Sequence, residues 1–144
     1  MKATAASSKA SGRSRASGSW GAGEAVTRVR AGFPVSEFNR VRQLLGLTVE
    51  GLAGKVGISI ATLSRRRHSR EPLDPSHSDR LLRFARLFRL AAELHGGDEE
   101  AARQWLRKPA RALDGETPLD HAETEVGARE VENLIGRLEH GVYT

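Results

Sequence analysis

The sequence predicts an all-α protein, because apolar residues recur at helical spacing and are flanked by residues that start and stop helices. The clearest case comes last in the chain, where an apolar stripe is formed by Val131, Leu134, Ile135 and Leu138. We expect Thr124 to cap this helix through its hydroxyl and Gly141 to end it in the left-handed conformation. The helix should therefore end near His140.

Length and charge indicate how the chain is divided. Its 144 residues, 38% hydrophobic and 28% charged, suit one or two small globular domains. Residues 1–34 carry six Lys/Arg against one Glu, residues 35–90 eleven against five acids, and residues 91–144 six against twelve. A basic first part suits nucleic acid, whereas an acidic last part suits a protein partner.

Composition also bears on location and chemistry. Cysteine is absent, which excludes disulfides and thiolate zinc sites, and no apolar run is long enough to span a bilayer. The absence of cysteine is compatible with a reducing cytosol, and we expect a protein without membrane contact, metal or cofactor. The five histidines, residues 68, 77, 95, 121 and 140, lack metal-ligand spacing, and no nucleophile stands near a base. We therefore predict that the chain is not an enzyme.

Residues 1–32 are rich in Ser, Ala and Gly, with scattered Lys and Arg. We interpret this segment as a disordered basic arm that attracts phosphates. A composition poor in acids and rich in Ser and Arg also resembles an organelle transit peptide, which is the alternative. Trp20 either docks on the folded part or is exposed.

Residues 33–75 contain three short helical segments. We expect Ser36 to cap the first, to about Leu45, Thr48 the second, and Ser59 the third, to about Arg67. A glycine turn at Gly57 joins the last two, and the expected inward residues are Leu52, Ala53, Val56, Ile58 and Leu63. Two short helices around such a turn are typical of a helix-turn-helix. Residues 47–65, Leu-Thr-x-x-x-Leu-Ala-x-x-Val-Gly-Ile-Ser-x-x-Thr-Leu-Ser-Arg, resemble the Xre/Cro repressors.

The third of these helices would present its outer side to DNA. The predicted DNA-binding residues are Ser59, Ile60, Ala61, Thr62, Ser64, Arg65, Arg66, Arg67 and His68. An arginine can donate two hydrogen bonds to one guanine, and we assign that role to Arg65. Arg66 and Arg67 would contact phosphates or solvent. Two glycines inside the second helix, Gly51 and Gly54, leave weak or degenerate DNA binding as an alternative.

Residues 76–97 should form the longest helix, capped by Ser76 or Ser78 and ending at Gly96–Gly97. Its apolar residues cover more than one face, so it must meet two neighbours. We expect it to connect the two domains and, because one small chain offers little cover, to favour a homodimer. An arginine at every third position, from Arg80 to Arg89, forms a stripe that either reaches DNA backbone or is solvated.

Residues 98–144 contain several motifs at fixed spacing. Asp98 can cap a helix that contains Trp105-Leu106, and Thr117-Pro118 reads as a further helix start. Leu113-x-Gly-x-x-Pro-Leu119, Glu125-x-Gly-Ala-x-x-Val131, and Leu138 with Gly141 follow. The arrangement resembles the toxin-binding domain of the Xre/MbcA/ParS family of bacterial type II antitoxins. The resemblance implies a partner toxin of the RES-domain class, which depletes NAD, and repression of the shared operon.

The predicted toxin-binding residues lie on the last helix and the tail after it: Arg129, Glu132, Asn133, Arg137, His140, Gly141, Val142, Tyr143 and Thr144. A pocket for anionic NAD usually contains basic groups, and a carboxylate beside an aromatic ring can occupy it. Our hypothesis is that the tail enters or covers that pocket; the alternative is that Tyr143 frays in solvent.

The working function is thus an antitoxin that binds a RES-domain toxin and operator DNA. A stand-alone DNA-binding regulator without a toxin partner is the alternative, and an accessory subunit of an enzyme is a third. The neighbouring reading frame distinguishes the first two, because only an antitoxin needs a toxin gene beside it.

Overall fold

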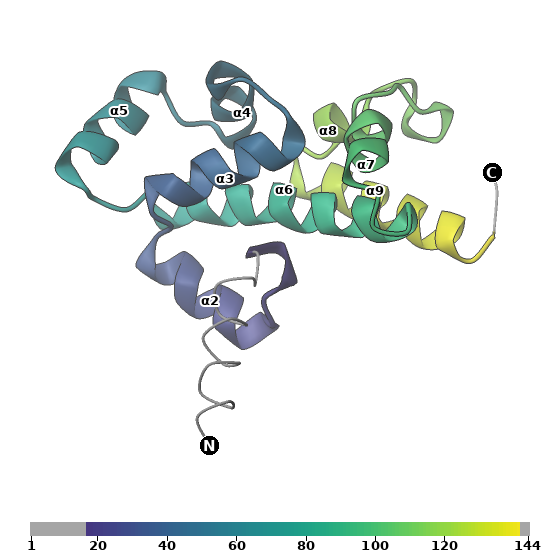
Figure 1. Cartoon of the computed structure of the whole chain (residues 1–144), viewed down its shortest axis with the longest axis horizontal. Coiled ribbons are helices and arrows are strands. Elements are labelled where there is room, and N and C mark those ends of the chain that lie inside the picture. The colour runs from purple at the N-terminus through teal and green to yellow at the C-terminus, as the bar shows by residue number, and fades with distance from the viewer. Residues whose placement is uncertain (1–16, 142–144) are drawn as a thin grey trace.

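The computed structural model describes residues 17–141; residues 1–16 and 142–144, which include part of the predicted arm and Val142, Tyr143 and Thr144, lie outside the described residues. Every element of the described part is a helix, as predicted (Figure 1). In chain order they are η1 (Ser17–Ser19), α2 (Ala22–Ala31), α3 (Val35–Leu45), α4 (Val49–Val56), α5 (Ile60–Ser69), α6 (Pro75–Leu94), α7 (Glu99–Leu106), η2 (Arg111–Leu113), α8 (Pro118–His121) and α9 (Glu125–Glu139).

Helix α6 is the centre of the structure. In Figure 1 it runs along the long axis, with α3, α4 and α7 on one side and α2 on the other, and it packs against all four as well as α9 and η1. Its buried residues are Ser78, Leu81, Leu82, Phe84, Ala85, Leu87, Phe88 and Ala91. One chain therefore covers α6 by itself, and the argument that its apolar surface needs a second copy was wrong.

Five predicted caps are confirmed. Each cap side chain accepts a hydrogen bond from the backbone N–H three residues later, which satisfies a donor that has no partner inside the helix. The capping residues are Thr48, Ser59, Asp98, Thr117 and Thr124. The last helix ends as predicted, because α9 stops at Glu139 and Gly141 has φ +74°.

Two predicted caps were wrong, and both helices begin at or next to a proline. Helix α3 begins one residue before Ser36, directly after Pro34, and α6 begins at Pro75. Pro75 is the first residue of α6, where proline fixes its own φ near the helical value and lacks only an N–H that the first turn does not use. Pro34 is instead the N-cap of α3, in an extended conformation and without a side-chain cap bond. Ser78 has another role: its buried Oγ accepts a hydrogen bond of 2.8 Å from the N–H of Phe33.

The prediction of disorder through residue 32 was wrong for residues 17–31, which form η1 and α2. Trp20 docks on the folded part: its ring lies edge-on to Phe33 at 5.3 Å, and the Arg28 guanidinium lies 4.6 Å from the indole centroid. Gly18 is buried, and its carbonyl accepts a 2.7 Å hydrogen bond from Arg89. Small residues in this segment therefore allow a close backbone approach to α6.

Helix α9 contains two glycines in contrasting surroundings, which gives a test of the α8–α9 packing. A Cβ on Gly127 would lie 1.7 Å from the carbonyl oxygen of His121, whereas a Cβ on Gly136 would meet no atom within 4 Å. Gly127→Ala should force α8 and α9 apart and lower the free energy of unfolding by about 1–3 kcal/mol. Gly136→Ala should raise it by up to about 1 kcal/mol, because alanine favours a helix interior.

Urea unfolding of both variants checks this prediction. Shifts of opposite sign support the close contact at Gly127. Equal shifts would contradict it.

Candidate DNA and partner interfaces

The predicted helix-turn-helix is formed by α4 and α5. Gly57 takes the left-handed conformation with φ +82° and turns the chain between the two helices. The residues predicted to face inward, Leu52, Ala53, Val56, Ile58 and Leu63, are all buried. The core side of this unit is therefore as expected, and the opposite side of α5 is left free for a ligand.

The outer side of α5 contains most of the predicted DNA-binding residues. Those that are exposed are Ser59, Ile60, Ala61, Ser64, Arg65, Arg67 and His68, whereas Thr62 and Arg66 are half-buried. Within the helix, residues 60, 61, 64, 65 and 68 follow the spacing of one face. In Figure 1, α5 lies at one end of the molecule, away from α7–α9.

The Ser59 hydroxyl is already used within the protein. Its Oγ accepts the N–H of Thr62 at 3.0 Å and donates to Thr62 Oγ1 at 2.9 Å. A serine hydroxyl has a single hydrogen to donate, so Ser59 cannot also donate to a phosphate in this arrangement. The Thr62 hydroxyl accepts that bond and keeps its own hydrogen for a ligand.

Arg66, which was predicted to contact phosphate or solvent, bonds to the loop between α5 and α6. Its guanidinium donates to the carbonyl of Pro72 at 2.5 Å and to the carboxylate of Asp74 at 2.8 Å. These bonds hold the chain just before α6 begins. Arg65 and Arg67 make no such bond within residues 17–141, and they remain the arginines of α5 that are free to contact DNA.

The arginine stripe of α6 is largely structural. Arg80 donates to the carbonyl of Val56 at 3.1 Å, Arg83 to that of Glu123 at 3.0 Å, and Arg89 to that of Gly18. Each bond joins α6 to a different segment. Three of the four arginines in the stripe therefore bond to other segments, whereas Arg86 is exposed.

Basic side chains also join the helix-turn-helix part to the last third of the chain. Arg103 donates to the carbonyl of Leu44 at 2.7 Å, and Arg107 to that of Leu45 at 2.9 Å, so α7 caps the end of α3. Both carbonyls lie in the last turn of α3, where acceptors lack partners inside the helix. The end of α3 is thereby fixed to α7.

Lys55 of α4 makes a second connection, to α8 and the turn after it. Its ammonium donates to Asp120 at 2.5 Å and to Glu123 at 3.0 Å, and the lysine side chain is only 12% exposed. The hydrogen bond from Lys55 lowers the pKa of Asp120. Burial acts to lower the pKa of Lys55, but its bonds to the two carboxylates raise it overall.

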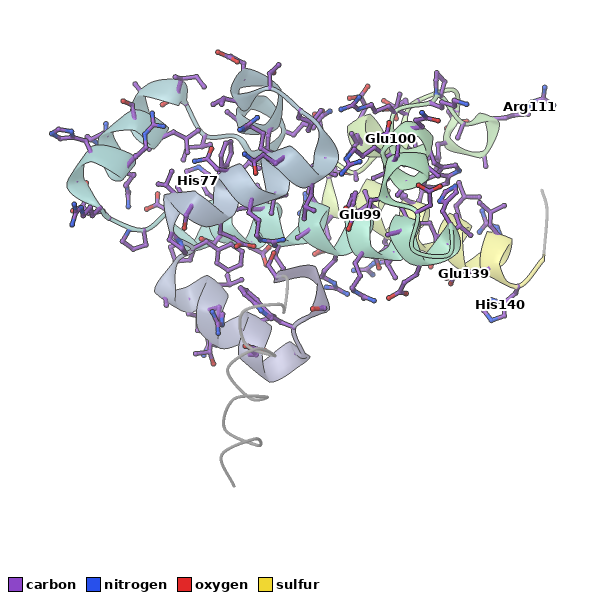
Figure 2. All side chains as sticks on the ribbon, viewed as in Figure 1. His77, Glu99, Glu100, Arg111, Glu139 and His140 are labelled. Atoms are coloured by element: carbon purple, nitrogen blue, oxygen red, sulfur yellow. The ribbon has the colours of Figure 1, made fainter. Side chains whose placement is uncertain are left out.

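The predicted toxin-binding residues of α9 gather around one shallow pocket. This pocket, of about 510 Å³, is lined by Glu132, Asn133, Gly136, Arg137 and His140. Figure 2 shows His140 projecting at the end of α9, and Gly141 follows it. Arg129 is exposed and lines a different pocket, between α6 and α9, which Glu132 also borders. The structure thus brings together four of these side chains and sets Arg129 apart.

His121 forms a bridge that the sequence did not reveal. Its Nδ1 lies 2.6 Å from a carboxylate oxygen of Glu116 and its Nε2 lies 2.5 Å from one of Glu130, although the imidazole is only 14% exposed. Hydrogen bonds to Glu130 and then Glu116 raise the pKa of His121 above 6.5. The two glutamates come five residues before and nine residues after it, a spacing with no periodic signal.

The described residues contain no group of His, Asp and Glu placed to hold a metal ion. None of the helices within residues 17–141 has the length and apolar character required to cross a membrane.

Comparison with known proteins identifies the class of protein. Residues 24–86 match the family profile described as an antitoxin Xre-like helix-turn-helix domain, and residues 90–141 match the antitoxin Xre/MbcA/ParS C-terminal toxin-binding domain. The chain is therefore an antitoxin that combines a helix-turn-helix with a toxin-binding domain. It belongs to the Xre family of antitoxins.

Individual relatives agree with this assignment. The chain is 35% identical to "Antitoxin Xre" of Yersinia enterocolitica over 83% of its own length and 80% of that protein. It is 35% identical to "Antitoxin Xre" of Photorhabdus laumondii over 77% and 75% of the two chains. A relative of Sphingobium sp., 24% identical over 80% and 77%, is named "Prs ADP-ribosylating antitoxin".

The His121 bridge predicts a pH dependence of folding stability. Because the pKa of His121 is raised in the folded protein, its stabilising effect is complete below pH 6.5 and is lost as the pH rises through the elevated pKa. We expect the free energy of unfolding to fall over that interval. His121→Gln and Glu130→Gln should both reduce the fall, as measured by urea unfolding at pH values from 5.5 to 8.5. An unchanged pH profile in His121→Gln would refute the bridge.

Proposed function

We propose that this antitoxin neutralises a RES-domain toxin that depletes NAD and represses the operon that encodes both proteins. Both activities belong in the bacterial cytoplasm, where operator DNA lies. The observation that carries the proposal is the presence, on one chain, of an exposed α5 face and a separate pocket on α9. The two surfaces lie at opposite ends of α6 (Figure 1).

Two observations support the proposed class of toxin. The motifs of residues 98–143 resemble those of antitoxins whose partners are RES-domain proteins. One relative's name links its antitoxin role to ADP-ribosylation of Prs. Transfer of ADP-ribose takes that group from NAD, so a toxin of this kind consumes the cofactor that the proposal names.

On the DNA side, we propose that Arg65 reads guanine and Arg67 contacts phosphate. Arg65 is exposed on the outer face of α5, where a planar guanidinium can donate two bonds to guanine O6 and N7. We keep the homodimer as part of the proposal, because helix-turn-helix repressors read paired half-sites about one DNA turn apart. Paired half-sites require two copies of α5 even though one chain buries the apolar surface of α6.

Arginine substitutions test the DNA-binding assignment. Arg65→Ala should reduce the preference for operator over random DNA by about 1–3 kcal/mol, the value of a good bidentate base contact. Arg67→Ala should weaken both kinds of binding alike and lower the salt dependence by about one charge. Arg66→Ala should instead lower the free energy of unfolding, because it frees the loop at Pro72. Gel shifts at two salt concentrations and urea unfolding distinguish the three variants. If all three behaved identically, the separate roles assigned to these arginines would be wrong.

On the toxin side, we propose that the pocket on α9 and the residues after it contact the toxin. Asn133 is exposed in the middle of the predicted surface, so a larger side chain there costs the folded monomer little. The tail hypothesis adds that residues 141–144 enter or cover the NAD pocket. The two ideas differ in which part of the antitoxin blocks the toxin.

Asn133→Trp should abolish neutralisation of the proposed RES-domain partner toxin, measured as growth during co-expression. Glu139→Trp is the matched control, because Glu139 is exposed on α9 but does not line the pocket. Deletion of residues 141–144 should release toxin activity while leaving DNA binding intact. If the truncated protein still neutralises the toxin fully, the α9 surface alone inhibits the toxin. If Asn133→Trp also neutralises fully, the assigned surface is wrong.

A further inference from the structure

Ile60 is an exposed branched hydrocarbon on the face of α5 that the proposal assigns to DNA. Its relative exposure is 44%, and within residues 17–141 the other exposed large hydrophobic residues are Val26 and Val126, on α2 and α9. A single exposed apolar residue is common on protein surfaces. The position of Ile60 is what makes it informative.

The core does not need Ile60. Ile58 and Leu63, on either side of it in the sequence, are each 5% exposed and fill the corner between α4 and α5. Ile60 is the first residue of α5, directly after a cap that two hydrogen bonds hold in place. Side chains in a helix lean towards its N-terminus, so Ile60 extends over the leading end of α5. A β-branched side chain there is also stiff.

The residues around Ile60 indicate which chemical group on DNA it can contact. Ala61, Ser64 and Arg65 share its exposed face, so the leading turn of α5 offers hydrocarbon and the next turn offers polar groups. In the major groove, the apolar group on a base edge is the C5-methyl of thymine. Hydrocarbon placed against the other base edges would leave their donors and acceptors without partners.

We propose that Ile60 recognises the C5-methyl group of a thymine in the operator. This inference rests on the proposed DNA-binding function and adds a base to it. Ile60 and Arg65 are five residues apart, about 7.5 Å along the helix axis. That distance corresponds to about two base-pair steps of 3.4 Å. Because a recognition helix lies in the major groove, we expect the thymine within about two base pairs of the guanine that Arg65 reads.

The experiment begins with selection of duplexes from a random pool by the full chain. Each thymine of the enriched sequence is then replaced by uracil, which removes only the methyl group, and affinity is measured by fluorescence anisotropy. The wild type should lose about fourfold in affinity at one thymine per half-site, as expected for one buried methyl group. When the thymine–adenine pair at that position is replaced by cytosine–guanine, 5-methylcytosine should bind better than cytosine and recover part of the lost affinity.

Variants connect the effect to Ile60. Ile60→Ser should bind the thymine and uracil duplexes equally, and Ile60→Val should keep most of the difference. Val126→Ser is the matched control, because Val126 is 72% exposed but lies on α9, and it should keep the full wild-type ratio. Urea unfolding of each variant confirms that the comparison is between folded proteins.

The outcomes separate the inference from the function on which it rests. If the pool yields no enriched sequence, the proposed DNA-binding function fails, and the thymine contact fails with it. If a sequence is enriched but no uracil substitution weakens binding, or Ile60→Ser keeps the wild-type ratio, only the thymine contact is refuted.

Discussion

The burial of α6 is the constraint on which the rest of this structure depends. A twenty-residue helix that is apolar on several sides cannot be stable in water alone, and most of the other helices contribute a face to its cover. The buried hydrogen bond from Phe33 to Ser78 fixes where the N-terminal segment meets it. The positions of the α5 face and the α9 pocket follow from where this cover leaves surface free.

Much of the helical framework could be predicted, because its signals are local. A Thr, Ser or Asp before an apolar stripe marks a helix start through one short-range hydrogen bond, and this identified Thr48, Ser59 and Thr124 correctly. The cap prediction at Ser76 failed because Pro75 offered a competing local start, and the one at Ser36 failed because α3 begins one residue earlier, directly after Pro34. Residues near a proline carry two overlapping signals, and the conformational one decides.

The candidate sites were less predictable, because they depend on contacts between distant residues. Nothing near Arg66 in the sequence marks it as the partner of Pro72, and nothing near Lys55 indicates Asp120. The sequence does not distinguish an arginine that donates to a backbone carbonyl from one that is free to bind a phosphate. Composition likewise led to a wrong prediction of disorder at Gly18, because small residues occur both in disordered tails and where backbones pack closely.

The continuity of α6 has a consequence for any attempt to divide this protein. The helix-turn-helix match ends at residue 86 and the toxin-binding match begins at residue 90, and both positions lie inside the single unbroken helix α6. Leu87 and Phe88 lie in that interval, and both are buried. A cut there would separate two named domains and would also remove from each half the apolar surface against which it packs. Two family profiles divide the chain, but its buried apolar residues form one core.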